Sequence, residues 1–243
     1  MAQGKGKAAA RVAQEIVQTI YDLGLNPGDR YLSEAEALAR HGVSRATFRE
    51  ALRFLELQGV VRVRAGPGGG TIVDRPDWPN LTSTFALLLQ FAGASLKDVM
   101  EARTALEPSM AALAAERADP STIAQLAAIL QEARDGLPDQ GRFLHAYRTF
   151  WMLTAKATGN AVTALLWPAL RALVDSGGFV PNEIYREVLV KRMSSLLDAL
   201  TAADSDAARR IVAEMDVEST KRLVDLYPKR VSRRVGWADV PID

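Results

Sequence analysis

Two arginines four residues apart, Arg45 and Arg49, lie near the start of this 243-residue sequence and are candidates for a binding role. Residues at this spacing share one face of an α-helix, and Ser44 and Thr47 stand beside them. Guanidinium and hydroxyl groups near a helix N-terminus suit phosphate oxygens and base edges, so the pattern predicts a nucleic-acid contact. Arg53 continues the same stripe. An ordinary solvated basic face is the alternative that these residues alone leave open.

Side chains that could bind a metal or act as a catalytic nucleophile are scarce in this sequence. The absence of cysteine excludes disulfides, thiolate zinc sites and cysteine nucleophiles, and the two histidines are His41 and His145. No motif pairs a nucleophile with a base, so no enzymatic activity is expected. His145 is expected at the surface, because two residues turn a helix by about 200° and take it off the face of Tyr147 and Trp151. His41 is interpreted as a turn residue rather than a ligand.

The composition sets outer limits on the kind of protein. Hydrophobic residues make up 48% of the chain, which is enough for one large or two modest domains. The net charge of +1 does not by itself indicate nucleic-acid binding. The N-terminal stretch lacks the apolar core of a signal peptide, and no apolar run approaches the roughly 20 residues that span a bilayer. We therefore expect a soluble, cytoplasmic protein with no membrane partner.

The elements that must position the arginines follow from apolar spacing and turn signals. A first helix is predicted to end at residues 24–28, and two short helices are predicted over about 33–41 and 44–58, with Ser44 as the N-cap of the second. The β-like runs 60–64 and 71–73 flank a glycine-rich turn. Two short helices followed by a hairpin form the winged helix-turn-helix, which places a recognition helix in the major groove of DNA.

The rest of the chain has a different pattern, and the predicted fold class is therefore mainly α. Successive amphipathic segments predict a bundle of six or seven helices, with breaks near Gly93, Pro120, 136–138, Gly159-Asn160, 177–178 and Asp204. The predicted organisation is a winged helix-turn-helix domain, a linker, an all-α domain for ligand sensing and dimerisation, and a C-terminal tail: residues 1–75, 76–80, 81–230 and 231–243.

The segment "YLSEAEALARHGVSRATFREALRFLELQGVVRVRAGPGGGTIV" resembles the winged-helix domain of the GntR family of bacterial transcription regulators. The resemblance implies a set of operator-contacting residues in the recognition helix and the wing: Ser44, Arg45, Thr47, Arg49 and Gly66. Family members often carry an arginine where this chain has Ala35 and a basic or polar residue where it has Ala65. These two departures bear on which operator sequence is recognised, and leave the DNA-binding activity itself expected.

The segment "SLKDVMEARTALEPSMAALAAERA", residues 95–118, is similar to the first helix of the effector domain of the FadR subfamily of this family. The resemblance implies an all-helical, dimeric, ligand-sensing domain, in which many members hold a divalent metal through an aspartate and three histidines. Here the four ligand positions fall on Tyr147, Trp151, Met193 and Met215. A phenol, an indole and two thioethers do not suit a hard or borderline cation. No metal and no other cofactor is therefore expected.

These soft side chains have two interpretations, a filled core or the wall of an apolar effector pocket. The subfamily often uses an arginine at Arg103 to meet an acidic effector, although Arg103 and Glu107 are also spaced for an ordinary surface ion pair. Ser219 is placed to hydrogen-bond a thioester or carboxylate. The candidate effector-binding residues are Arg103, Tyr147, Trp151, Met193, Met215 and Ser219.

Together these features predict a homodimeric, ligand-responsive transcriptional regulator, expected to be a repressor. Its partners are operator DNA and a small, apolar, acidic effector such as a fatty acid or acyl-CoA, which must bind two states unequally to change operator affinity. Two alternatives stay open: a metal-dependent sensor of a small carboxylic acid, and a DNA-binding dimer with no small-molecule effector.

Overall fold

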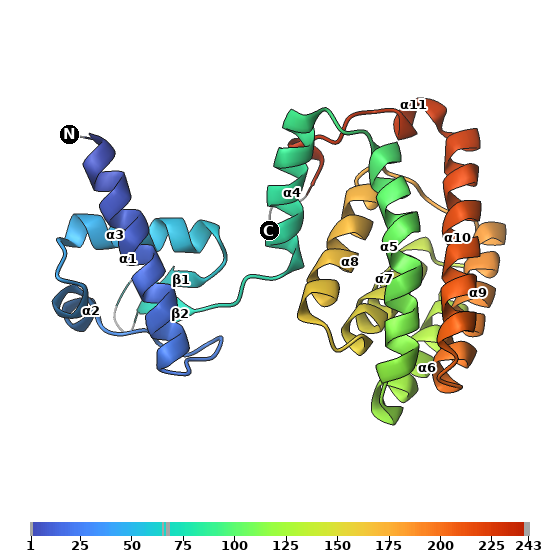
Figure 1. Ribbon diagram of the computed structural model, residues 1–243, viewed down its shortest axis with the longest axis horizontal. Helices are drawn as coiled ribbons and strands as arrows, with labels where there is room; N and C mark the ends of the chain where they lie inside the picture. Colours follow the sequence, from blue (N-terminus) through green and yellow to red (C-terminus); the bar gives the residue numbers. More distant parts are fainter. Residues whose placement is uncertain (1, 65, 67–68, 241–243) are drawn as a thin grey trace. The chain divides into compact units, whose positions relative to one another are not determined.

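The protein divides into two compact units, residues 1–80 and 81–243, in a computed structural model that describes residues 2–64, 66 and 69–240. The first unit contains three helices and a two-stranded hairpin (Figure 1). In chain order these are α1 (Ala2–Asp22), α2 (Glu34–His41), α3 (Arg45–Leu57), β1 (Val61–Arg64) and β2 (Gly70–Val73). This confirms the predicted winged helix-turn-helix.

Local sequence signals set the helix-turn-helix geometry. Ser33 and Glu36 form a reciprocal capping box at the start of α2, which satisfies backbone N–H groups that a first helical turn leaves unpaired. Gly42 ends α2 with φ of 60°, a left-handed conformation that glycine adopts without a Cβ clash. Ser44 then caps α3, because its hydroxyl accepts a hydrogen bond from the Thr47 backbone N–H at 3.2 Å. The turn between the helices is therefore short and fixed.

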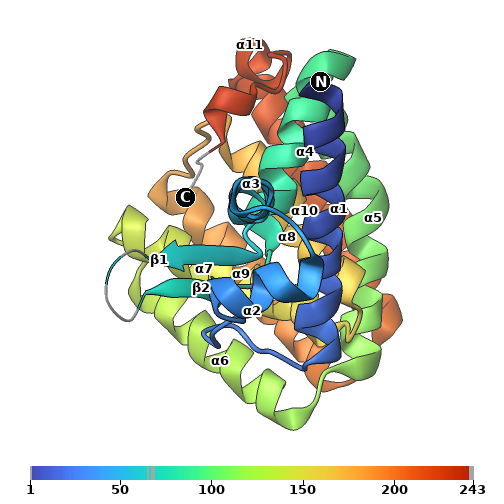
Figure 2. The same cartoon turned by 90° about the vertical axis from the view of Figure 1, so that its left-hand side faces the viewer.

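The hairpin lies next to the helices of the same unit (Figure 2). β1 and β2 pair antiparallel, from Val61 opposite Val73 to Arg64 opposite Gly70. One core joins all these elements, and its buried members include Val12, Ile16, Ala37, Phe48, Leu52, Leu55, Val61 and Val73. Burial of these apolar side chains holds the recognition helix against its supports.

The second unit is a helical bundle (Figure 1). Within residues 78–226, all of which the structure describes, seven helices follow one another: α4 (Trp78–Ala92), α5 (Leu96–Arg117), α6 (Pro120–Asp135), α7 (Gln140–Ala157), α8 (Ala161–Asp175), α9 (Glu183–Thr201) and α10 (Ser205–Leu226). The breaks coincide with the glycine, proline and capping signals of the sequence. The mainly α fold class is confirmed.

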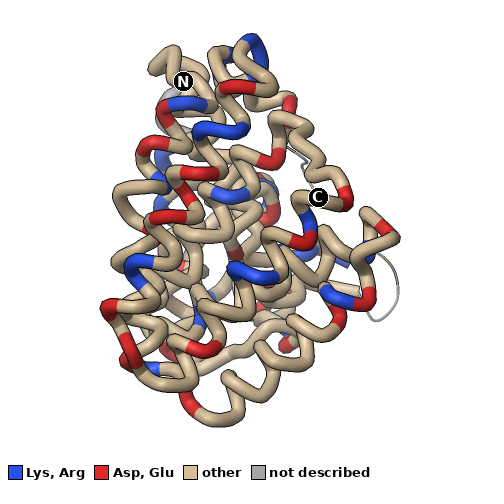
Figure 3. The backbone as a smooth tube through the Cα atoms, turned by 90° about the vertical axis from the view of Figure 1, so that its right-hand side faces the viewer, with Lys and Arg blue, Asp and Glu red and all other residues tan. Residues whose placement is uncertain are grey.

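The main core of this unit joins α5 to α10 and contains Phe143, Phe150, Trp151, Trp167 and Met193. A second cluster joins Ala86 of α4 to Leu96, Leu170 and Leu173. Acidic and basic residues are interspersed along the helices (Figure 3). No helix among the described residues is long and apolar enough to cross a membrane.

The chain beyond α10 forms a C-terminal strap, defined here as residues 228–240. It comprises the short helix α11 (Pro228–Val231), an extended stretch and a 3₁₀ turn, η1 (Trp237–Asp239). Val231, Val235 and Val240 are buried in the second cluster. The strap is therefore packed on the bundle over residues that we predicted as a tail, and α4 begins at Trp78, within the segment predicted as linker.

Candidate functional site

The outer face of α3 presents the predicted recognition residues to solvent. Arg45, Arg49 and Arg53 are all exposed. Arg45 keeps 82% of its side chain accessible and only reaches Glu34 at 4.0 Å, a weak surface contact. Ser44 and Thr47 hydrogen-bond each other at the N-terminal end, with their hydroxyl oxygens 3.0 Å apart. This end of α3 therefore offers donors and positive charge together.

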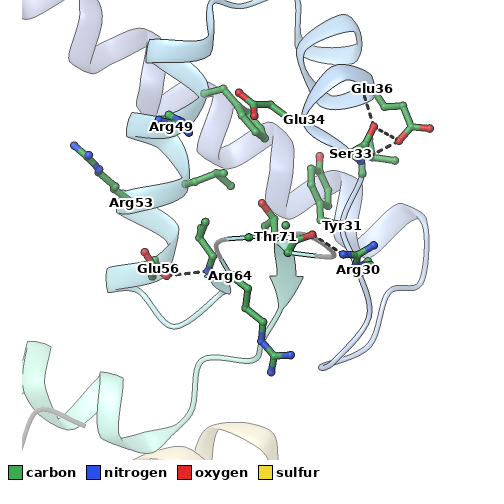
Figure 4. Close-up of a pocket in the computed structure, with 17 residues that line it drawn as sticks. Arg30, Tyr31, Ser33, Glu34, Glu36, Arg49, Arg53, Glu56, Arg64 and Thr71 are labelled. Atoms are coloured by element: carbon green, nitrogen blue, oxygen red, sulfur yellow. Dashed lines mark hydrogen bonds between the residues drawn. The ribbon is translucent and has the colours of Figure 1, made fainter.

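A hollow of about 830 Å³ separates α3 from the hairpin of the same unit, and arginines line it (Figure 4). Arg49 and Arg53 come from α3, Arg64 comes from β1, and Arg30 precedes α2. Glu56 of α3 accepts a hydrogen bond from the Val63 backbone N–H at 2.9 Å, which ties the hairpin to the helix. Arg30 and Arg64 were not among the predicted residues, because sequence spacing does not reveal which arginines a hairpin brings to a helix.

Two further residues singled out in the sequence, Gly66 and His41, belong to the wing and to α2 of the first unit. Gly66 is exposed in the wing with φ of 94°, while Ala65 lies outside the described residues. His41 is the last residue of α2, and its ring is buried between Tyr31 and Glu15, with nitrogen to oxygen distances of 2.9 and 3.2 Å. The predicted turn residue is thus a structural hydrogen-bonding group that supports the helix-turn-helix.

The bundle contains an effector-sized cavity of about 350 Å³, bounded by α5, α7, α8, α9 and α10. Apolar side chains form much of its wall: Leu144, Val174, Phe179, Val180, Pro181, Leu189, Met215, Leu223 and Leu226. Its polar groups include Arg103, Tyr147, Arg171, Asp216, Ser219 and Arg222. A pocket of this size with a few convergent polar groups has the features of a small-molecule site. We call it the bundle pocket.

Two arginines converge on one carboxylate at the polar side of the bundle pocket. Glu107 is fully buried and accepts hydrogen bonds from Arg103 Nε at 2.7 Å and from Arg171 Nη2 at 2.8 Å. Burial alone would raise the pKa of Glu107, but Arg103 and Arg171 outweigh it and hold that pKa below its usual range. The pair of Arg103 and Glu107, for which the spacing also allowed an ordinary surface ion pair, is buried, and Arg171 of α8 adds a second cation to it.

Arg171 is held by aromatic rings as well as by Glu107. Its guanidinium carbon lies 4.0 Å from the ring centre of Trp151 and 5.7 Å from that of Tyr147, and its Nη1 donates to the Tyr147 hydroxyl at 3.2 Å. Cation–π contact is strongest over indole and when the cation is partly desolvated. Only 12% of the Arg171 side chain is exposed, so its position is fixed.

Asp216 is the weakly held acid of this group. It is 3% exposed, its Oδ1 is 3.6 Å from Arg103 Nη2, and its Oδ2 has no hydrogen-bond partner within the described residues. Burial and the neighbouring Glu107 raise the pKa of Asp216 to about 7, against the opposing effect of Arg103 and Arg171. Asp216 therefore titrates near neutral pH.

The predicted effector residues separate into two groups. Arg103, Tyr147, Met215 and Ser219 line the bundle pocket, and Ser219 Oγ is 3.0 Å from the Tyr185 hydroxyl. Trp151 and Met193 are 2% and 0% exposed and belong to the core rather than to the pocket lining. His145 is exposed, as the helical geometry predicts.

Both units match families of known proteins. Residues 8–73 match the gntR family of bacterial regulatory proteins, and residues 98–216 match the FCD domain. The uncharacterized HTH-type regulator Rv0494 of Mycobacterium tuberculosis is 31% identical over 226 residues, which cover 90% of this chain and 91% of that protein. The chain belongs to the GntR family. As a GntR-family protein with an FCD domain, it is a DNA-binding transcriptional regulator and not an enzyme.

Two further proteins are similar to this chain. The galactonate operon transcriptional repressor of Escherichia coli is 26% identical over 206 residues, covering 82% of this chain and 90% of the repressor. A solved structure of a Streptococcus agalactiae GntR protein superposes with a TM-score of 0.70 at 20% identity, covering 88% of this chain and 99% of the other. The structural likeness shows that the fold is shared.

The residues of this GntR-family chain do not fit the metal that the FadR-subfamily resemblance implies. Trp151 and Tyr147, two of the four ligand positions, face the guanidinium of Arg171, so a cation already occupies the place beside them. Met193 and Met215 offer only thioethers. In the described ranges, no cluster of three or more His, Cys, Asp or Glu residues could hold a metal ion.

Proposed function

We propose that this GntR-family regulator is a homodimeric repressor, and that its affinity for operator DNA falls when a small organic acid with an apolar body occupies the bundle pocket. The observation that carries the effector proposal is the pair Arg103 and Arg171 beside an otherwise largely apolar wall. A carboxylate suits the guanidinium groups, since charge-assisted hydrogen bonds of this kind are strong. An apolar body suits the wall, since its burial removes hydrocarbon from water.

The size of the bundle pocket narrows the class of acid. Its volume of about 350 Å³ lies near the lower end of the roughly 300–1,000 Å³ that is usual for small-molecule pockets. A medium-chain fatty acid or a small aromatic acid is of this size. An acyl-CoA is far larger, which favours the free acid over the thioester.

The DNA-binding proposal assigns Arg45 and Arg49 to base edges and phosphates, with Ser44 and Thr47 at the same helix end and Gly66 in the wing. The exposure of both arginines beside the arginine-lined hollow supports this assignment. Two copies of α3 in a dimer would read two half-sites about one DNA turn apart. The relatives named as repressors, the galactonate operon repressor and NanR of Citrobacter rodentium, support repression as the mode of action.

One binding experiment tests the proposal. A duplex is selected from a random library by the wild-type protein, and its affinity is then measured by fluorescence anisotropy for wild type, Arg45→Ala and the control Arg142→Ala, an exposed arginine of α7. Loss of a specific base contact costs about 1–3 kcal/mol, so Arg45→Ala should bind about tenfold or more weakly. Arg142→Ala should bind as wild type. Equal binding by Arg45→Ala would show that the recognition helix is wrongly assigned.

The same assay tests the effector with octanoate, the uncharged octan-1-ol, and galactonate, the sugar acid in the name of the E. coli relative. We expect octanoate to weaken operator binding and octan-1-ol to leave it unchanged. A response to galactonate alone would reject the apolar body and retain the acid. No response to either acid would favour a DNA-binding dimer without a small-molecule effector.

A further inference from the structure

We infer that the effector binds through a single carboxylate, which replaces Asp216 as the counter-ion of Arg103 and Arg171. This inference rests on the proposed acidic effector and specifies how the bundle pocket selects it. Two parts of the structure support it: a fixed ion cluster formed by Arg103, Glu107 and Arg171, and one acid, Asp216, which lies beside that cluster 3.6 Å from the Arg103 guanidinium.

The fixed part is the set of contacts around Glu107. Arg103 donates from Nε to Oε1 at 2.7 Å and from Nη2 to Oε2 at 3.2 Å, and Arg171 donates to Oε2 at 2.8 Å. Both oxygens of this fully buried carboxylate are therefore used, and both guanidinium groups are held in place. Paired geometry of this kind compensates the cost of burying the charges. The three side chains together carry one net positive charge.

The exchangeable part is Asp216. Its closest ionic contact, 3.6 Å to Arg103, exceeds a hydrogen-bond distance, and its buried Oδ2 has no partner within the described residues. A buried carboxylate oxygen without a donor is costly, which favours the protonated acid. The pKa of about 7 agrees with that geometry. Other charged or titratable residues also line the bundle pocket around this cluster, among them Tyr147, Arg148, Asp175, Tyr185 and Arg222.

The net charge of the cluster together with Asp216 determines which ligand charge it can accept. With Asp216 ionised, the two arginines are neutralised by two internal carboxylates, and an incoming anion meets no net positive charge. With Asp216 protonated, one positive charge is uncompensated and matches one carboxylate. Arg171 Nε, a buried donor without a partner in the described structure, adds a further hydrogen bond that the cluster leaves unmade. A dicarboxylate would bring a second negative charge into the bundle pocket, where Arg148 is already paired with Asp175 at 2.8 Å and Arg222 lies over the Tyr185 ring, 4.2 Å from its centre. The cluster itself offers one positive charge and therefore matches one carboxylate.

This arrangement also gives a physical role to the aromatic residues at the lost metal positions. Trp151 and Tyr147 hold Arg171 by cation–π contact, so a guanidinium supplies the positive charge on that side of the bundle pocket. Trp151 therefore supports the anchor from within the core, without touching the effector.

The test compares octanoate with suberate, a dicarboxylate of the same chain length, by titration calorimetry at about pH 8. We expect wild type to bind octanoate at least tenfold more tightly than suberate. Asp216→Asn should bind octanoate about tenfold more tightly than wild type, because wild type must first neutralise a carboxyl group with a pKa of about 7. Glu214→Gln removes an exposed carboxylate of the same helix, which pairs with the partly exposed Arg192 at 3.3 Å, and should stay within about twofold of wild type.

The outcomes separate this inference from the proposed function. Equal octanoate affinity of Asp216→Asn and wild type, or equal binding of suberate, overturns the counter-ion exchange and leaves the acidic effector standing. No binding of octanoate or galactonate by either protein overturns both. If Asp216→Asn does not fold, the wild-type affinity for octanoate should still fall about fivefold between about pH 7 and pH 8, and a flat profile overturns the inference.

Discussion

Glu107 is the residue on which the buried charges of the FCD domain depend. It is fully buried and accepts from two guanidinium groups, so its loss leaves two poorly compensated cations in the core. Removing one partner of such a group typically costs about 3–5 kcal/mol. We therefore expect Glu107→Gln to lower the free energy of unfolding by about 3 kcal/mol, measured by urea denaturation at neutral pH.

The matched control lies on the same helix. Glu101 is 61% exposed and pairs with Lys97 at 3.5 Å, and Glu101→Gln should cost no more than a few tenths of a kcal/mol. The pKa of Glu107 is lowered, so its contribution is present above the ordinary glutamate pKa and is lost as pH falls below it. The pKa of Asp216 is raised, so its contribution is present in acid and is lost as pH rises through about 7. Equal costs for the two glutamines would contradict the buried-cluster interpretation.

The sequence predicted part of the bundle pocket but missed two of the charged residues around Glu107. The register that places Tyr147 and Met215 beside a cavity was readable from sequence, because helical spacing fixes which side chains share a face. The same register cannot tell a pocket wall from a core, and Trp151 proved to be core. Arg171 and Asp216 were missed because they come from α8 and α10, and only tertiary packing brings them to Glu107.

Helix ends were the most predictable elements, and the C-terminal strap was the least. Capping residues and glycines marked the ends of the helices because they satisfy backbone groups locally. The strap has no apolar period, and its position depends on contacts far away in the chain. Val235 donates its backbone N–H to the Ala94 carbonyl at 2.9 Å, and Trp237 donates its Nε1–H to Ser83 Oγ at 2.9 Å. Such pairings leave no signal in local sequence.

The strap should stabilise α4, the helix that follows the DNA-binding unit in the chain. Trp237 also donates its backbone N–H to Gln90 at 2.7 Å, so it contacts α4 at two places. Trp237→Ala should remove the ring and the bond to Ser83, and amide hydrogen exchange over residues 78–92 should become faster. Exchange over residues 120–135 of α6, where Trp237 makes neither of its two hydrogen bonds, should not change. Unchanged exchange in α4 would mean that other contacts hold it.

At the scale of the whole molecule, sequence periodicity predicted the winged-helix and all-α classes of the two compact units, and the surface of α4 bears on how two chains assemble. Helix α4 exposes large apolar side chains, with Phe91 at 85%, Leu88 at 62% and Leu81 at 37% exposure. Contiguous exposed apolar groups on one helix are typical of a protein–protein interface. We therefore expect α4 to contribute to the homodimer interface that would bring two recognition helices to one operator.

Phe91→Asp places a charge at the centre of that apolar face and should convert the dimer to a monomer, measured by sedimentation velocity. The variant should keep its helical circular dichroism, because Phe91 packs on nothing that its own unit needs for its core. Its affinity for the selected duplex should fall by at least an order of magnitude, since one unit would then read a single half-site.

Val162→Asp is the matched control, because Val162 is 69% exposed at the start of α8 and an aspartate suits a helix N-terminus. A Phe91→Asp protein that still sediments as a dimer would place the interface elsewhere, whereas a monomer with full operator affinity would separate DNA binding from dimerisation altogether.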